Sequence, residues 1–360
     1  MRIYVDHTHV WRHVTGVERV TLKLFSKTAL APFDLVPIEA RSFGGMVFNQ
    51  QLGLPALLAL SRASLLLCPG FPPAPLLQAF GARVIPYIHD VFLLSRRGDL
   101  NWRAKVYSAW PFALALRRLR RFLVNTHDTG NKLAAYCRAD ADVIIYRPPA
   151  ENAFGLSADG RAARMKHPAA LRLAAIGTVE PRKNLPAAAQ ILSALRQRGF
   201  ADATLDIVGR RGWGEDWETL TVLPGVTLHG YQSETVVREI LDAADALICT
   251  SHEEGLGLPL LEAQYAGLPV IAPDHAVFHE VLGASAIFID QADAAAAAAA
   301  IECHLATDGW RAIAVERAAA NLRRWNDAAA SDRDRVVEML GRLARDGDGV
   351  TRQFGVARKA

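Results

Sequence analysis

Residues 246–273 read ALICTSHEEGLGLPLLEAQYAGLPVIAP, and this stretch indicates the fold class. Its apolar start, Ala246–Cys249, predicts a buried strand, and Pro269–Ala272 predicts another, with a helix over Pro259–Ala266 between them. Two strands joined through a helix are typical of a parallel sheet. The glycine-containing loop after the first strand would expose backbone N–H groups where the helix begins, which is a natural place for a diphosphate.

Two glutamates stand eight positions apart in this stretch, Glu254 in the loop and Glu262 in the helix. A carboxylate in the helix can accept hydrogen bonds from the two hydroxyls of a ribose, and the earlier carboxylate would face the group beyond the phosphates. Taken as an isolated pair, two such residues are in most cases solvated helix charges. The glycines, Pro259 and the preceding strand favour a binding site.

The same alternation of short apolar runs and helical patterns extends over most of the 360 residues. It predicts two parallel sheets, each covered by helices on both faces. We therefore expect an α/β fold of two Rossmann-like, doubly wound domains facing a cleft, residues 1–165 and 170–330. A helix over 331–345 and a flexible tail over 346–360 would follow. The predicted strands are Arg2–Val5, Leu65–Cys68, Val84–Ile88, Arg121–Asn125, Val143–Tyr146, Leu171–Ile176, Thr204–Val208, Val226–Leu228, Ala246–Cys249, Pro269–Ala272 and Ala286–Ile289.

The composition excludes several classes of protein. With 51% hydrophobic and 22% charged residues, the chain has the makeup of a globular protein and not of a disordered one. Its four cysteines have neither metal-site nor disulfide spacing, which predicts reduced thiols. We find no secretory leader and no uncharged apolar run of membrane-spanning length, so we expect a cytoplasmic protein.

The net charge of +4 conceals two unlike halves. Residues 1–166 hold 22 Lys and Arg against 11 Asp and Glu, whereas the remainder holds 19 against 26. Part of the basic surplus is interleaved with aromatic residues and leucines. Such a segment either lies against an anionic membrane surface or is a charged outer face that keeps the domain in solution. Nucleic acid is not expected, because no nucleic-acid motif accompanies the charge. The basic residues concerned are Arg96, Arg97, Arg103, Lys105, Arg117, Arg118, Arg120 and Arg121.

The loop and helix of residues 246–273 resemble the E-x7-E signature of retaining glycosyltransferases of family 4, the glycosyl transferases group 1, with Leu256 where phenylalanine is usual. A second block, Gly177-Thr178-Val179-Glu180-Pro181-Arg182-Lys183-Asn184, resembles the G-T-x-E-P-R-K-N block of the same family. The resemblance covers residues 1–330 and is strong from Gly177 to Pro273. It implies a GT-B fold and sugar transfer with retention of anomeric configuration, with no metal ion and no other cofactor.

The resemblance also implies roles for individual residues. Lys183 and Arg182 would stabilise the departing nucleoside diphosphate, Glu254 would orient the sugar, and Glu262 would hold the ribose. Thr178 takes the place where other branches of the family carry an arginine directly after the glycine. The donor site as a whole would comprise Gly16, Gly177, Thr178, Lys183, Glu254, Gly255, Leu256, Gly257, Leu258 and Glu262.

The N-terminal half matches the family more loosely. Residues 15–20, TGVERV, resemble the family's turn between its first strand and first helix, which would bring the backbone near Gly16 to the diphosphate or the acceptor. Ile88-His89-Asp90 resembles the I-H-D at the end of a strand in that domain. The catalytic pocket would then include His89 beside the sugar and the acceptor, with Asp90 as a further acceptor contact.

Two other patterns stay open. His7, His9 and His13 form H-x-H-x3-H, which is either a metal site or, in the absence of accompanying carboxylates or cysteines, a loop beside the cleft. Residues 209–214, GRRGWG, predict a mobile loop after a strand, whose arginines either approach phosphate or are solvated.

The resemblance implies a hexosyltransferase that uses a nucleotide-diphosphate sugar. GDP-mannose is favoured, because the G-T-x-E-P-R-K-N form is common among relatives that build bacterial surface polysaccharides with mannose or rhamnose. The expected acceptor is a saccharide or a polyprenyl-linked saccharide, at the inner face of the cytoplasmic membrane. A GT-B sugar-nucleotide epimerase or phosphorylase and a non-catalytic sugar-nucleotide-binding scaffold remain as alternatives.

Overall fold

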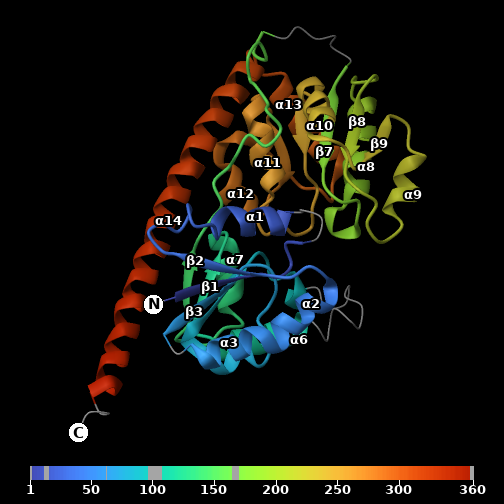
Figure 1. Cartoon of the computed structure of the whole chain (residues 1–360). Coiled ribbons are helices and arrows are strands. Elements are labelled where there is room, and N and C mark those ends of the chain that lie inside the picture. Colours follow the sequence, from blue (N-terminus) through green and yellow to red (C-terminus); the bar gives the residue numbers. More distant parts are fainter. Residues whose placement is uncertain (1, 12–15, 62, 96–107, 164–169, 357–360) are drawn as a thin grey trace. The chain divides into compact units, whose positions relative to one another are not determined.

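The computed structural model describes residues 2–11, 16–61, 63–95, 108–163 and 170–356, with side chains as far as Arg345. The chain divides into two compact units. Unit 1 comprises Met1–Pro148 and Ala328–Ala360, and unit 2 comprises Pro149–Asp327. Each unit is built around a six-stranded sheet whose paired strands all run parallel, as the sequence predicts (Figure 1).

The sheet of unit 1 has the strand order β2-β1-β3-β4-β5-β6, a doubly wound arrangement that reverses between β1 and β3. The sequence predicts every strand except β2, which reads LVPIE and has one buried residue. β2 is an edge strand, and proline is tolerated there because only one side of the strand needs its N–H groups. The strands are β1 Arg2–His7, β2 Leu35–Glu39, β3 Ser64–Cys68, β4 Val84–Ile88, β5 Arg121–Val124 and β6 Asp142–Ile145.

Helices cover both faces of this sheet. On one face, α3, η2, α6 and α7 share a buried core with the strands, to which Leu58, Leu77 and Phe112 contribute. On the other face, beside α1, Phe25 packs edge-on against the rings of Tyr87 and Tyr146. The described helices are α1 Gly16–Leu24, α2 Phe43–Phe48, η1 Asn49–Gly53, α3 Leu54–Leu60, η2 Leu77–Arg83, α4 Phe92–Ser95, α6 Trp110–Arg118 and α7 His127–Ala134.

The sheet of unit 2 has the order β12-β11-β10-β7-β8-β9. Counted from β7, this is the 3-2-1-4-5-6 order of dinucleotide-binding folds, and its winding reverses between β7 and β10. Ligands of such sheets bind at the carboxyl ends of the strands beside this reversal. The strands agree with those predicted: β7 Arg172–Ile176, β8 Thr204–Val208, β9 Val226–Gly230, β10 Ala246–Ile248, β11 Val270–Pro273 and β12 Ala286–Ile289.

Two buried clusters fill the space between this sheet and its helices. α10, α11 and α12 pack on one face together with Trp325, and α8 and α13 pack on the other. Polyalanine starts α13, where Asp293 accepts a hydrogen bond from the Ala296 N–H at 2.9 Å and caps the helix. The helices are η5 Pro181–Lys183, α8 Leu185–Gln197, α9 Asp216–Thr221, α10 Glu234–Ala243, α11 Leu258–Ala263, η6 Gln264–Ala266, α12 Ala276–Leu282, η7 Gly283–Ser285 and α13 Ala294–Leu305.

The sequence predicts that the first domain ends at residue 165, whereas the first unit of the structure ends at Pro148. The segment that follows is bound to unit 2. Tyr265 Oη donates to the Ala150 carbonyl oxygen at 3.1 Å, and the buried Arg161 guanidinium donates to the carbonyl oxygens of Leu241 and Ala244 at 3.1 and 2.7 Å. These carbonyls belong to the last turn of α10 and its C-cap, so Arg161 fixes the segment against the end of that helix.

The final helix, α14, runs from Trp310 to Val356. It begins before and ends after the predicted helix 331–345, and residues 346–356 are helical where the sequence predicts a tail. No proline interrupts α14, and buried Val336, Met339 and Leu340 continue the helical apolar spacing within unit 1. Although α14 is long, it is rich in charged residues. Among the described residues, we find no helix with both the length and the apolar character to cross a membrane.

Candidate functional site

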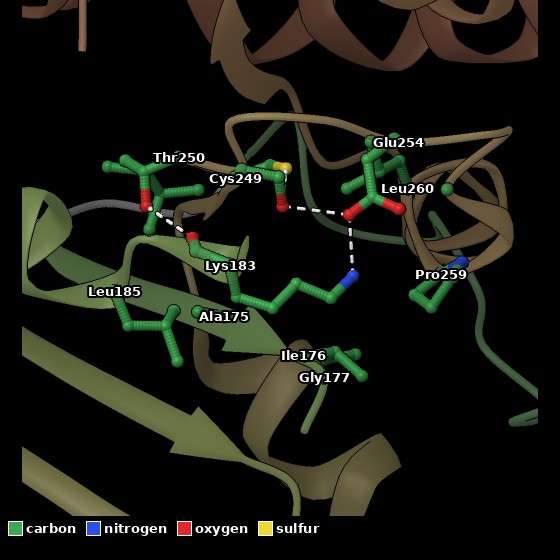
Figure 2. A pocket seen from close by; sticks show the side chains of 13 residues that line it. Ala175, Ile176, Gly177, Lys183, Leu185, Cys249, Thr250, Glu254, Pro259 and Leu260 are labelled. Carbon is green, nitrogen blue, oxygen red and sulfur yellow. Dashed lines mark hydrogen bonds and ion pairs between the residues drawn. The ribbon is translucent and has the colours of Figure 1, made fainter. Parts of the chain in front are cut away.

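A pocket lies at the winding reversal of unit 2, where β7 and β10 end side by side. β7 leads into Gly177 and the turn η5, and β10 leads into the loop that precedes α11. The residues that the resemblance singled out in both loops are therefore brought together, although they are some seventy positions apart in the chain. Figure 2 shows the pocket, which is lined by Ala175, Ile176, Gly177, Lys183, Leu185, Ile248, Cys249, Thr250, Ser251, Glu254, Gly257, Pro259 and Leu260.

Lys183 reaches across this pocket to Glu254. Its Nζ atom lies 2.5 Å from Glu254 Oε1, and the two side chains point toward each other in Figure 2. Lys183 ends the short helix η5, and its side chain passes over Gly177, where a Cβ atom would lie 3.2 Å from Lys183 Cε. Thr250 Oγ1 donates to the carbonyl oxygen of Asn184 at 2.8 Å and holds the turn against the end of β10.

Glu254 is a buried carboxylate inside a set of donors. Besides Lys183, Ser251 Oγ donates to its Oε1 at 2.7 Å and Arg182 Nη1 donates to its Oε2 at 3.3 Å. Burial by itself would raise the pKa of Glu254, but the charges of Lys183 and Arg182 and the hydrogen bonds outweigh it and hold the pKa below its ordinary value. Glu254 is therefore ionised at neutral pH.

Arg182 joins the two loops and does not line the pocket. Its guanidinium donates to Glu180 Oε1 at 2.9 and 3.2 Å, to the Glu253 carbonyl oxygen at 3.0 Å and to Glu254 Oε2. In return, the His252 N–H donates to the Arg182 carbonyl oxygen at 3.0 Å. The structure thus places Arg182 behind Glu254, with its donors directed at protein atoms.

The remaining donor residues of the E-x7-E segment have different surroundings. Gly257 precedes α11 in the left-handed region, with φ +77°, where glycine is favoured. Leu256 is buried in the core of unit 2. Glu262 lies on α11 and is 2% exposed. The lining of the pocket includes Gly257 but not Glu262, nor Thr178, Gly255, Leu256 and Leu258.

The sequence left open whether the arginines of residues 209–214 approach phosphate or are solvated. In the structure, this loop packs against the residues that lead into the site. A Cβ atom at Gly209 would overlap the carbonyl oxygen of Gly177, and one at Gly212 would lie 2.7 Å from the carbonyl oxygen of Val179. The glycines therefore allow the loop to pack against the residues that precede η5. Arg210 lies over the ring of Tyr231 at 5.9 Å, and Arg211 forms an ion pair with Glu218. Neither arginine lines the pocket.

Sequence reasoning assigned no role to Thr250 and Ser251, which precede Glu254 within residues 246–273 and donate hydrogen bonds to Asn184 and Glu254. Small hydroxyl residues just after a predicted strand were the only available signal. Their functional position becomes evident only in the structure, where they lie at the carboxyl end of β10, beside the winding reversal.

In unit 1, His89 follows β4, and its half-buried ring packs against Tyr87 with ring centroids 4.8 Å apart. His89 Nε2 lies 2.7 Å from the Pro69 carbonyl oxygen, which only accepts, so this nitrogen carries the proton. Burial lowers the pKa of His89, which leaves the ring neutral at neutral pH. Asp90 accepts a hydrogen bond from the Phe92 N–H at 3.0 Å, and Gly16 is the exposed first residue of α1.

The histidines near the N-terminus do not form a metal site within the described residues. His9 is buried, its Nε2 lies 3.1 Å from Thr21 Oγ1, and its ring occupies the space beside Gly70. His7 ends β1, and burial lowers its pKa. His13 lies outside the described residues, as do Arg96, Arg97, Arg103 and Lys105.

Residues 170–307 match the family model of glycosyl transferases group 1. The chain is 32% identical over 156 residues to the O-antigen chain mannosyltransferase B of Escherichia coli, and the alignment covers 42% of this chain and 41% of that one. The chain therefore matches less than half the length of this curated relative.

Two solved structures resemble nearly the whole chain. Alr3699/HepE of Anabaena, in complex with UDP and glucose, has a TM-score of 0.67 at 16% identity, covering 95% of this chain and 99% of that one. WaaG, a glycosyltransferase involved in lipopolysaccharide biosynthesis, has a TM-score of 0.60 at 14% identity, covering 94% and 99%. The chain thus has the GT-B fold, and its residues 170–307 match the model of glycosyl transferases group 1.

Proposed function

We propose that this protein is a retaining glycosyltransferase that moves a hexose from a nucleotide-diphosphate sugar to a hydroxyl of a saccharide acceptor. The observation that carries the proposal is the pairing of Lys183 with Glu254 at the winding reversal of unit 2. A cation held beside a buried, ionised carboxylate suits a ligand with a diphosphate at one end and sugar hydroxyls at the other. Unit 2 is accordingly assigned to the donor and unit 1 to the acceptor.

In the proposed reaction, the bond between the anomeric carbon and the diphosphate oxygen breaks, and the diphosphate leaves with the electron pair. Lys183 stabilises the negative charge that builds up there, together with N–H groups of the loop around Gly255 and Gly257 and of the turn at Gly177 and Thr178. The acceptor hydroxyl forms the new bond on the same face of the sugar. Its proton passes to an oxygen of the departing diphosphate.

Glu254 accepts hydrogen bonds from the sugar hydroxyls, and Glu262 accepts hydrogen bonds from the two hydroxyls of the ribose. Arg182 was expected to assist at the diphosphate, but its contacts support a different proposal. By bridging Glu180 and Glu254, Arg182 holds the sugar-facing carboxylate in place, so it is a positioning residue. Lys183 is then the one side-chain cation among the described residues that line the pocket.

The acceptor is assigned to unit 1 through His89, Asp90 and the backbone at Gly16. Because His89 Nε2 donates to the Pro69 carbonyl, the neutral ring has Nδ1 left to accept a hydrogen bond from a hydroxyl. A neutral histidine of lowered pKa is also able to orient a sugar hydroxyl without adding charge.

The donor and acceptor are proposed in more detail from the relatives. A named mannosyltransferase of O-antigen chains among them supports GDP-mannose as the donor and surface polysaccharide synthesis as the setting. The proposed acceptor is a saccharide or polyprenyl-linked saccharide at the inner face of the cytoplasmic membrane. Arg117 and Arg118 are exposed and suit anionic lipid, whereas Arg120 and Arg121 face Asp140 and Asp142 at 3.9 Å.

The test is a thermal-shift panel of GDP-, UDP-, ADP- and dTDP-sugars, followed by assays of transfer to saccharide acceptors with the preferred donor. A ligand that binds only the folded protein raises its melting temperature, so we expect GDP-mannose to give the largest shift. NMR of the product should show the anomeric configuration of the donor. Failure of every donor to bind would refute the proposal, and inversion would refute retention. Isomerised sugar nucleotide released without an acceptor would indicate an epimerase instead.

A further inference from the structure

Residues 43–60 of unit 1 contain no charged side chain. They form one continuous helical run, from α2 through the π-helix η1 to α3. Met46, Leu54 and Leu58 of this run are buried, so one side of the helix supplies the core of the unit. A surface helix normally carries polar or charged residues on its other side.

The outer side of this run is apolar instead. Phe48, Leu52, Ala56 and Leu60 follow one another at intervals of four, which places them on one side of a helix. All four are exposed, and the exposed fractions of Phe48, Leu52 and Leu60 are 61%, 53% and 88%. A row of protruding apolar side chains of this length is not explained by packing within the unit.

Neighbouring elements extend the row into a surface. α3 and α6 both contact η2, and residues of all three helices share one buried core with the strands. Leu76, next to η2, is 55% exposed, and Trp110 at the start of α6 is 56% exposed. We define the apolar surface as Phe48, Leu52, Leu60, Leu76 and Trp110.

Exposed cations lie on or next to the same helices as the apolar surface. Arg41 precedes the helical run by two positions, and Arg117 and Arg118 end α6. Residues 40–61 include Arg41 but no Asp or Glu. Apolar side chains together with arginines complement the interfacial region of a membrane that contains anionic lipid, in which acyl chains receive the apolar groups and phosphates receive the guanidinium groups.

We propose that the apolar surface of unit 1 docks on an anionic lipid bilayer, with the helical run 43–60 lying in the interfacial plane. Separate side chains that protrude as far as Leu60 suit a fluid acyl layer, which surrounds them without a matching shape. This contact shares Trp110, Arg117 and Arg118 with the basic segment 96–121 considered above, but its main source of binding is the insertion of apolar side chains. Membrane contact of this kind also goes beyond the proposed sugar transfer, since it requires no donor chemistry.

The experiment is flotation of the full chain with vesicles of phosphatidylcholine, with and without phosphatidylglycerol. Leu52→Glu and Leu60→Glu each remove an inserted side chain and add a charge, so each should lower the partition coefficient by about tenfold or more. Val222→Glu is the matched control, because Val222 is 78% exposed in unit 2. The wild type and Val222→Glu should float equally with the anionic vesicles, and high salt should weaken the binding.

Two outcomes would overturn the membrane contact: no flotation of the wild type, or equal flotation of the two leucine variants. Size-exclusion chromatography tests whether the apolar surface binds a second copy of the chain instead. An oligomer that Leu52→Glu converts to monomer would identify the surface as a contact between copies. Thermal melting verifies that the exposed substitutions leave the fold intact. Nucleotide binding by the same samples is a separate readout, so loss of flotation with intact binding contradicts only the membrane contact.

Discussion

Replacing Glu254 by glutamine should tighten the binding of a nucleoside diphosphate while it slows sugar transfer. In the structure, the Glu254 carboxylate holds the Lys183 ammonium at 2.5 Å. The same ammonium is proposed to bind the diphosphate, so the carboxylate and the phosphates compete for one cation and repel each other. Glutamine keeps the shape of the side chain and removes its charge.

The size of the effect follows from the geometry. A phosphate oxygen bonded to the same ammonium at about 2.8 Å would lie about 5 Å from the carboxylate. At an effective dielectric constant of about 20, two unit charges at about 5 Å repel by about 3 kcal/mol. Arg182 and Ser251 already stabilise the carboxylate, which reduces the gain. We expect about 1–2 kcal/mol, which lowers the Kd for GDP by about five- to thirtyfold.

Isothermal titration with GDP measures this change, and initial rates with the preferred donor sugar measure kcat. Because glutamine orients the sugar less well than the carboxylate, kcat should fall by about a hundredfold. Glu253→Gln is the matched control: it makes the same charge change at the neighbouring position, and Glu253 does not line the pocket. Melting temperatures establish that both variants are folded under the assay conditions.

Equal or weaker GDP binding by Glu254→Gln, relative to Glu253→Gln, would refute this reasoning. It would mean that Lys183 is not the cation that binds the diphosphate, or that Glu254 mainly fixes the ammonium in the correct place. Tighter GDP binding with unchanged kcat would support the charge argument but contradict the proposed contact between Glu254 and the sugar.

Three further predictions concern the same site and its support. Lys183→Ala should lower kcat by about 10²–10³ in initial-rate assays, because the leaving diphosphate loses its cation; full turnover would contradict that role. The pKa of Glu254 is lower in the folded protein than its ordinary value of 4.5, so its ionisation stabilises the fold above that value, and this contribution is lost as the pH falls through the lowered pKa. Acid unfolding curves should accordingly converge for the wild type and Glu254→Gln at low pH and separate toward neutrality. Gly209→Ala should lower the free energy of unfolding by about 1–3 kcal/mol, because its Cβ overlaps the Gly177 carbonyl, whereas Gly44→Ala, with open space around it, should melt no lower than the wild type.

Much of the fold was accessible from the sequence. Parallel α/β units produce apolar strands and periodic helices that leave local patterns, and eleven of the twelve observed strands were predicted from them. The exception, β2, is an edge strand with one buried residue, so its pattern is weaker than that of the fully buried β4, which was predicted although it contains Pro86. The first predicted domain runs to residue 165, beyond the unit boundary at Pro148, because the contacts of Arg161 with α10 join residues about eighty positions apart.

The site shows the same division. The resemblance of two short motifs to those of a glycosyltransferase family predicted Lys183, Glu254 and Glu262 as donor residues, because each motif is a continuous run in the sequence. The contacts of Lys183 and Arg182 with Glu254 cannot be read from the motifs. They form because the tertiary structure places β7 and β10 side by side. Likewise, residues 43–60 are visibly uncharged in the sequence, but only the packing of Leu54 and Leu58 into the core determines which side remains exposed. Local patterns determine which elements form, whereas contacts between distant residues, and the faces left without such contacts, are properties of the tertiary structure alone.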